Sequence, residues 1–194
     1  MNAPLLSMRG IVKDYGGVPV LRDVDFAVRA GEIHALVGEN GAGKSTLMKV
    51  LGGATEAASG TIAIEGQVVA ITTPADAERL GIAIVHQDLS LVPELTVADN
   101  VFLGREPVRR GTWPPLVDRV AMERDARAVL ARLGETGLVP RRRVAELGMA
   151  QRQLVEIARG LARRARVLAF DEPTAPLAPP EIERLFAALS ALKE

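Results

Sequence analysis

One segment of the chain has the residue types and the spacing for phosphate binding. The glycine loop, residues 38–46, contains the pattern G-x-x-x-x-G-K-[ST], whose fixed positions are Gly38, Gly43, Lys44 and Ser45. The glycines allow a tight turn whose backbone N–H groups point at phosphate oxygens. Lys44 supplies a cation for the β and γ phosphates, and the Ser45 hydroxyl can ligate Mg²⁺. For this pattern alone, a glycine-rich turn with a solvated lysine is the alternative.

A second group of candidate residues, Asp171 and Glu172, lies far along the chain. The apolar run Val167–Phe170 before them predicts a core strand. Asp171 at its end can hold Mg²⁺ through water, and Glu172 can polarise the attacking water as a general base. An acidic turn after a strand is the alternative, and the glycine loop in the same chain favours the hydrolytic interpretation.

Hydrophobic periodicity and turn residues predict the strands that position these groups. Strands are expected over residues 5–12, 24–28, 33–37, 61–64, 67–71, 82–85 and 167–170. The nearly continuous apolar segment Ile33–Val37, directly before the glycine loop, is typical of a central parallel strand. Glu65–Gly66 resembles the favoured Asp-Gly hairpin loop and predicts an antiparallel pair.

Helices are expected after the glycine loop and through most of the second half. Apolar residues recur at helical spacing over residues 47–51, 126–133, 151–161 and 182–192. Thr73 with Asp76, and Thr96 with Asp99, have the spacing of a helix cap and predict two further helix starts. Residues 105–115 hold glycine, prolines, arginines and the chain's only tryptophan, and predict an exposed loop.

The order of these elements predicts an α/β fold in one domain. A β-rich layer and the glycine-loop core occupy residues 1–88, a helical insertion follows over 89–160, and the chain returns to the core over 161–194. We expect a parallel core sheet beside an antiparallel N-terminal sheet.

Composition excludes several classes of protein. The 24 basic side chains balance 24 acidic ones, so the chain has no field to attract nucleic acid, and no nucleic-acid partner is expected. The lack of cysteine excludes a disulfide framework and a thiolate metal site. No apolar run is long enough to span a bilayer. A soluble chain is therefore expected, with any membrane role exercised through a partner.

Four segments, in their order along the chain, resemble the motifs of an ABC transporter ATPase. They are Gly38–Thr46, Val85–Gln87, Leu147–Gln151 and Asp171–Thr174. The resemblance covers nearly the whole chain. It implies a P-loop NTPase core with a parallel sheet, an N-terminal antiparallel β subdomain and an inserted helical subdomain.

Three further segments resemble the simple-sugar importers of the ribose, galactose and xylose type. They are Gly31–Val37, Val85–Leu89 and Asn100–Pro107. Two ATPase domains are fused in one chain in such proteins, and this sequence resembles most of the first. The chain ends at Glu194, before the family's last core strands and its switch histidine. We therefore expect a C-terminally incomplete ATPase domain that alone binds Mg-ATP weakly and turns it over little.

The resemblance implies a role for each motif residue. ATP would be bound by Tyr15, Gly38, Glu39, Asn40, Gly41, Ala42, Gly43, Lys44, Ser45 and Thr46. Mg²⁺ would be held by Ser45, Gln87 and Asp171, and the catalytic residues would be Glu172, Gln87 and Lys44. Tyr15 would stack on adenine, and a surface tyrosine at a strand end is the alternative. Gln87 would reach Mg²⁺ and the attacking water while its loop senses the membrane subunit, and a solvated glutamine is the alternative.

The signature segment would act on ATP bound by a second subunit. It consists of Leu147, Gly148, Met149, Ala150 and Gln151, and an ordinary loop before a helix is the alternative. The resemblance places it at a helix N-terminus, where it caps the γ-phosphate of the partner's ATP.

Two substitutions depart from the family's pattern. Gly148 stands where the family usually has serine, so a hydroxyl that would bind the partner's γ-phosphate is missing. Ala175–Ala178 replaces Ser-Ala-Leu and a polar residue, which leaves fewer groups to cross a dimer interface. These changes weaken the expected composite site.

The resemblance implies an ATP-hydrolysing subunit that powers sugar import. Its partners would be a second ATPase domain, fused or homodimeric and arranged head to tail, the membrane permease subunits and, indirectly, a periplasmic sugar-binding protein. It would lie on the cytoplasmic side of the inner membrane as a peripheral protein. Two alternatives are a nucleotide-dependent dimerising module with little hydrolysis and a soluble ABC protein acting in translation or DNA repair. The second would usually carry basic or coiled-coil insertions, which this sequence lacks.

Overall fold

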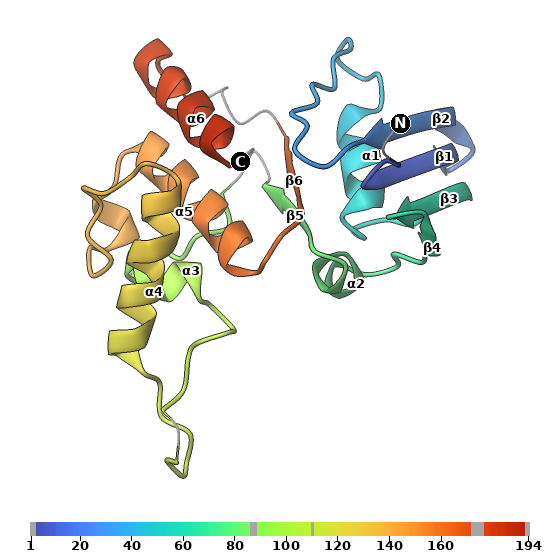
Figure 1. Ribbon diagram of the computed structural model, residues 1–194. Coiled ribbons are helices and arrows are strands. Elements are labelled where there is room, and N and C mark those ends of the chain that lie inside the picture. The colour runs from blue at the N-terminus through green and yellow to red at the C-terminus, as the bar shows by residue number, and fades with distance from the viewer. Residues whose placement is uncertain (1–2, 86–88, 110, 172–176, 193–194) are drawn as a thin grey trace. The chain divides into compact units, whose positions relative to one another are not determined.

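The computed structural model describes residues 3–85, 89–109, 111–171 and 177–192. These residues form two compact units (Figure 1). The first comprises residues 3–84 and 165–171, and the second comprises the described parts of 85–164 and 177–192.

The first unit contains a four-stranded antiparallel sheet. Its strands are β1 (Leu6–Tyr15), β2 (Val18–Val28), β3 (Ser59–Ile64) and β4 (Gln67–Val69), in the order β2-β1-β3-β4. Glu65 and Gly66 join β3 to β4 with φ angles of 51° and 80°. A two-residue hairpin turn of type I′ needs positive φ at both positions. The predicted hairpin is confirmed.

Helix α1 (Lys44–Leu51) packs on this sheet (Figure 1). It buries Leu47, Val50 and Leu51, the three residues at helical spacing in the sequence. The core that receives them is formed by Leu6, Met8, Ile11, Leu21, Ile62, Ile64, Ile71, Ala77 and Ile82. Because the glycine loop leads directly into α1, this packing fixes the loop to the sheet.

Helix α2 (Pro74–Arg79) begins at the predicted cap. The Thr73 hydroxyl accepts from the Asp76 N–H, and the Asp76 carboxylate accepts from the Thr73 N–H at 2.8 Å. Hydrogen bonds from the hydroxyls of Thr73 and Thr72 hold the pKa of the Asp76 carboxyl well below its ordinary value.

A two-stranded sheet pairs β5 (Ile82–Val85) with β6 (Val167–Phe170). The predicted strand Ile33–Val37 is wrong: no regular strand covers these described residues. Leu36 packs against the core of the first unit, whereas Val37 is 88% exposed. An apolar run becomes a central strand only where neighbours pair with it on both sides, and a local pattern does not report those neighbours.

The second unit is helical. Its elements are α3 (Val97–Val101), α4 (Arg119–Arg132), the 3₁₀ turn η1 (Val144–Glu146), α5 (Met149–Ala162) and α6 (Pro179–Ala191). Ala98 of α3 packs with Met122 and Ala126 of α4. These helices confirm the helical character predicted for this part of the chain.

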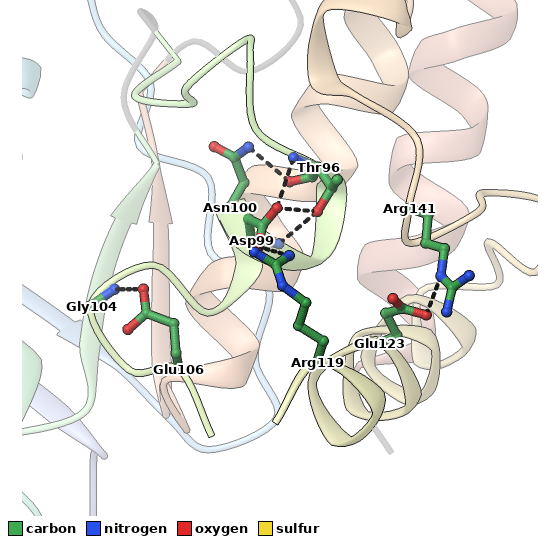
Figure 2. Close-up of polar contacts among 8 residues, drawn as sticks. All are labelled: Thr96, Asp99, Asn100, Gly104, Glu106, Arg119, Glu123 and Arg141. Atoms are coloured by element: carbon green, nitrogen blue, oxygen red, sulfur yellow. Dashed lines mark hydrogen bonds and ion pairs between the residues drawn. The ribbon is translucent and has the colours of Figure 1, made fainter. Parts of the chain in front are cut away.

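Polar contacts link α3 and α4 to the segments around them (Figure 2). Asp99 accepts from the Thr96 hydroxyl at 2.6 Å, which confirms the second predicted cap, and it also pairs with Arg119 at 3.4 Å. Glu123 of α4 accepts from Arg141 at 2.7 Å. Helix α4 is thus tied both to α3 and to the segment that leads into the signature segment.

The loop between α3 and α4 is exposed, as predicted. Val108 and Val117 form an antiparallel bridge at its base, and Trp113 is 93% exposed. The loop extends away from the helices of its own unit (Figure 1).

Candidate functional site

The glycine loop has the backbone conformation that its glycines permit. Gly41 and Gly43 have φ angles of 85° and 93°, in the left-handed region that favours glycine. A Cβ on Gly43 would lie 2.7 Å from Leu21 Cδ2 and 3.1 Å from the Val20 carbonyl oxygen. The loop therefore passes so close to β2 that only glycine fits at position 43.

Lys44 closes the loop. Its Nζ donates to the carbonyl oxygens of Gly38 at 2.7 Å and Glu39 at 2.9 Å. An ammonium has three N–H donors, so one remains for a further acceptor. Residues 38–42 are exposed, so a ligand can approach the loop from solvent.

Ser45 and Asp171 come together although 126 residues separate them. Ser45 lies in the first turn of α1, and Asp171 directly follows β6. The Ser45 hydroxyl donates to Asp171 Oδ1 at 3.2 Å. A hydroxyl and a carboxylate are hard oxygen ligands of the kind that Mg²⁺ takes, usually one or two from protein with the rest from water and phosphate. Exposed Ser45 and half-buried Asp171 together fit such an ion.

Tyr15 lies at the end of β1, paired with Val18 across the first hairpin. Its side chain is 47% exposed, and Lys13 Nζ lies 5.1 Å from its ring centroid. Val20, two residues after Val18 on β2, is one of the residues that Gly43 approaches closely. The aromatic ring thus belongs to the hairpin that touches the glycine loop.

The signature segment lies in the second unit, at the start of α5. Leu147 is 4% exposed and anchors it, whereas Gly148 and Met149 are exposed. Gly148 is the N-cap of α5 with φ −67° and ψ 164°, and a Cβ added there would meet nothing within 4 Å. Because the first N–H groups of a helix have no partner within it, the start of α5 at these exposed residues can receive an anion.

Two predicted site residues, Gln87 and Glu172, lie outside the described residues. The same holds for Pro173 and Thr174 and for the first half of the altered segment Ala175–Ala178. Of that segment, Leu177 is 9% exposed and Ala178 donates its N–H to the Glu181 carboxylate at 2.9 Å.

Two absences concern only the part of the chain that the structure describes. Within it, no three His, Cys, Asp or Glu side chains cluster in a way that could hold a metal ion. Nor do its helices include one with the length and apolarity to cross a membrane.

Some contacts around these residues were not anticipated from the sequence. Lys13 lies over the Tyr15 ring, and its position two residues earlier on the same strand is a signal that could have found it. Ser90, Glu156 and Arg159 form a polar group in the second unit. No local pattern marks that group, because Ser90 lies 66 residues before Glu156 and 69 residues before Arg159.

The glycine loop at the start of α1 and the carboxylate at the end of β6 define a phosphate-binding α/β protein. Residues 21–175 match the family model for the ABC transporter. The chain belongs to this family, and the resemblance drawn from its motifs is confirmed.

Similar proteins agree with this assignment. The chain is 54% identical over 191 residues to ribose import ATP-binding protein RbsA 1 of Rubrobacter xylanophilus, covering 98% of this chain and 37% of that protein. It is 51% identical over 189 residues to ribose import ATP-binding protein RbsA of Chromobacterium violaceum, covering 97% of this chain and 37% of that protein. The chain thus spans little more than a third of the length of these relatives.

Solved structures confirm the predicted fold class. An ATP-binding cassette of an ABC transporter in its ADP conformation superposes with a TM-score of 0.83 at 29% identity, covering 98% of this chain and 77% of that one. A nucleotide-free ATP-binding cassette of an ABC transporter gives a TM-score of 0.83 at 28% identity, covering 98% and 78%.

Proposed function

We propose that the chain binds ATP with Mg²⁺ at the glycine loop. The observation that carries this proposal is the 3.2 Å contact between Ser45 Oγ and Asp171 Oδ1. It joins the loop expected to hold the phosphates to the carboxylate expected to hold the metal. Residues 38–42 and Ser45 are exposed and Asp171 is half-buried, so nucleotide can enter from the exposed side of the loop.

Each residue of the proposed site has a separate task. The backbone N–H groups of residues 38–46 surround the phosphates, and Lys44 keeps one donor for the β and γ phosphates. Tyr15 stacks on adenine with the face of its ring that Lys13 leaves free. Mg²⁺, when bound, supplies charge that stabilises the transferring phosphoryl group. Ser45, Asp171 and Gln87 are its proposed ligands.

Hydrolysis is assigned to Glu172, with Gln87 as the residue that orients the water. Glu172 accepts the proton of the attacking water, a role for a carboxylate next to the metal-binding Asp171. This part of the proposal rests on their sequence positions.

We further propose that the chain is part of a carbohydrate importer. Relatives at about half identity are named ribose import ATP-binding proteins, which supports a simple sugar as the transported class. Residues 1–88 and 161–194 would form the nucleotide-binding core and 89–160 the helical subdomain of one ATPase domain. Its partners would be a second such domain, head to tail, membrane permease subunits and a periplasmic sugar-binding protein. The chain would lie on the cytoplasmic face of the membrane.

A second candidate is a nucleotide-dependent pairing module with little turnover. The observation favouring it is Gly148, which gives the exposed start of α5 no hydroxyl. A side-chain hydrogen bond to phosphate is therefore missing from the segment that would complete a partner's site. ATP would still bring two chains together in such a module, without rapid release of phosphate.

Equilibrium binding of a fluorescent ATP analogue tests the site. Lys44→Ala should lower affinity at least about tenfold, since hydrogen bonds to charged groups are worth roughly 1.5–3 kcal/mol. Lys49→Ala is the matched control, because Lys49 is exposed in the last turn of the same helix. Circular dichroism checks that both variants fold. Equal affinity in the two variants would show that nucleotide binds elsewhere.

Phosphate release measured beside ATP-dependent pairing separates the two candidates. Pairing accompanied by phosphate release supports the transport ATPase. Pairing without it supports the module.

A further inference from the structure

A polar group in the second unit joins helix α5 to the segment before α3. The Ser90 hydroxyl donates to Glu156 Oε1 at 2.8 Å and accepts from Arg159 Nη1 at 3.0 Å. Arg159 Nη1 also donates to the Ser90 carbonyl oxygen at 3.1 Å. We call these three residues the Ser90 cross-link. The Ser90 hydroxyl thus bonds both a carboxylate and a guanidinium on neighbouring turns of α5.

The two charged members, Glu156 and Arg159, have few other polar contacts within the described part of the chain. Glu156 is 8% exposed, and its direct distance to Arg159 is 3.7 Å, longer than a hydrogen bond. Among the residues described, neither Glu156 Oε2 nor Arg159 Nε has a hydrogen-bond partner. Because a buried charge is costly without hydrogen bonds, Ser90 is, among the described residues, the main hydrogen-bond partner of the Glu156 and Arg159 side chains.

The segment after Ser90 is also paired with the segment before the signature. Ala145 and Val144 donate backbone N–H groups to the carbonyls of Pro93 at 2.9 Å and Leu95 at 3.0 Å. Farther along, Val97 donates to Arg142 and Ala98 donates to Pro140, at 2.9 and 3.0 Å. This pairing ends two residues before Leu147. It holds the chain that enters the signature segment.

Buried Asn100 stiffens the first of these segments. Its side chain accepts from the Val92 N–H at 2.7 Å and donates to the carbonyls of Val92 and Thr96, both at 3.0 Å. The contact with Thr96 is drawn in Figure 2. Residues 92–100 are therefore held as one piece, which begins two residues after Ser90.

Helix α5 is thus attached to this piece, and to Ser90 just before it, at two places along its axis. One lies before its first residue, through residues 140–145, and the other lies at Glu156 and Arg159. At 1.5 Å per residue, Glu156 and Arg159 are roughly 10 to 15 Å along the helix from Met149. Two attachments that far apart fix the direction of a helix, whereas one would let it pivot.

We propose that the Ser90 cross-link positions the signature segment, with Glu156 and Arg159 acting as positioning residues. The proposal rests on the proposed function, in which the signature segment caps the phosphate of a partner's ATP. By fixing the direction of α5, the cross-link fixes where Gly148 and Met149 present their backbone N–H groups. It does so without touching nucleotide.

Hydrogen exchange on the 194-residue chain tests this role. Ser90→Ala removes the hydroxyl at an exposed position and leaves no cavity. It should speed exchange of the Val144, Ala145 and Arg152 amides by about tenfold, because these report the start of α5. Ser90→Thr keeps the hydroxyl and should stay within about twofold of the wild type.

Val155→Ala is the matched control. Val155 is fully buried on α5 but outside the cross-link, so this variant lowers stability without removing a polar contact. It should speed exchange over the whole unit rather than at residues 144–152. Unchanged exchange in Ser90→Ala, or the same local pattern in Val155→Ala, would overturn the positioning role.

A second measurement links the cross-link to pairing. Ser90→Ala should weaken ATP-dependent pairing by about tenfold while the affinity of the single chain for ATP changes less than about twofold. Equal pairing in Ser90→Ala and the wild type would contradict the proposal. If ATP induces pairing of neither the wild type nor Ser90→Ala, the proposed function fails. Hydrogen exchange at residues 144–152 alone then decides the positioning role.

Discussion

Restoring a serine at position 148 should strengthen ATP-dependent pairing. Gly148 has φ −67° and ψ 164°, a conformation that any residue adopts, and a Cβ there meets nothing within 4 Å. The Gly148→Ser side chain therefore enters without strain. As the N-cap of α5, its hydroxyl can accept from the helix and still donate to a phosphate oxygen.

The expected gain comes mainly from the phosphate contact. Serine and glycine differ as N-caps by only a few tenths of a kcal/mol, so the chain's own stability should change little. A hydrogen bond to a charged group is worth roughly 1.5–3 kcal/mol. At about 1.4 kcal/mol for each factor of ten, each contact should tighten pairing roughly 10- to 140-fold.

Sedimentation velocity with a non-hydrolysable ATP analogue measures this effect. Gly148→Ala is the control, because it adds the Cβ without the hydroxyl and is a poorer N-cap than glycine. The alanine variant should pair no better than the wild type. Equal pairing by all three proteins, with nucleotide bound to each, would show that position 148 does not face a partner's phosphate.

Two further predictions concern the glycine loop and the cap of α2. Gly43→Ala should cost roughly 2–5 kcal/mol from its positive φ and its 2.7 Å approach to Leu21. Gly41→Ala, which meets nothing within 4 Å, should cost roughly 1–2 kcal/mol, and equal urea midpoints for the two variants would contradict the packing argument. Because hydrogen bonds lower the pKa of Asp76 below its ordinary value of 3.8, its contribution to stability is present at neutral pH and is lost as the pH falls below about 4. Urea midpoints from about pH 6 to about pH 2 should therefore fall less steeply in Asp76→Asn, and parallel curves would argue against the shift.

Local chemistry made several elements predictable from the sequence. Threonine and aspartate three residues apart specify a helix start by themselves, and both predicted caps, at Thr73 and Thr96, are present. Glu65–Gly66 similarly carries its own turn geometry. In each case the residues that make the contact are neighbours in the chain, so the sequence contains the whole interaction.

Features that depend on distant partners were harder to predict. Ile33–Val37 has the composition of a central strand, yet pairing is decided by whatever lies beside it. The contacts of Ser90 with Glu156 and Arg159 join common residue types. These contacts span 66 and 69 residues of the sequence, so no local spacing pattern links the residues that make them. The proximity of Ser45 and Asp171 also depends on the fold, and only a known order of motifs suggested that they meet.

The exposure of Trp113 decides how this protein should be followed in solution. Its indole is the only one in the chain and is almost fully hydrated in the folded state. Unfolding therefore changes its surroundings little, and its emission is a poor measure of stability. The same property makes it a selective optical reporter: a shift of its emission to shorter wavelength would mark an apolar surface covering the loop between α3 and α4.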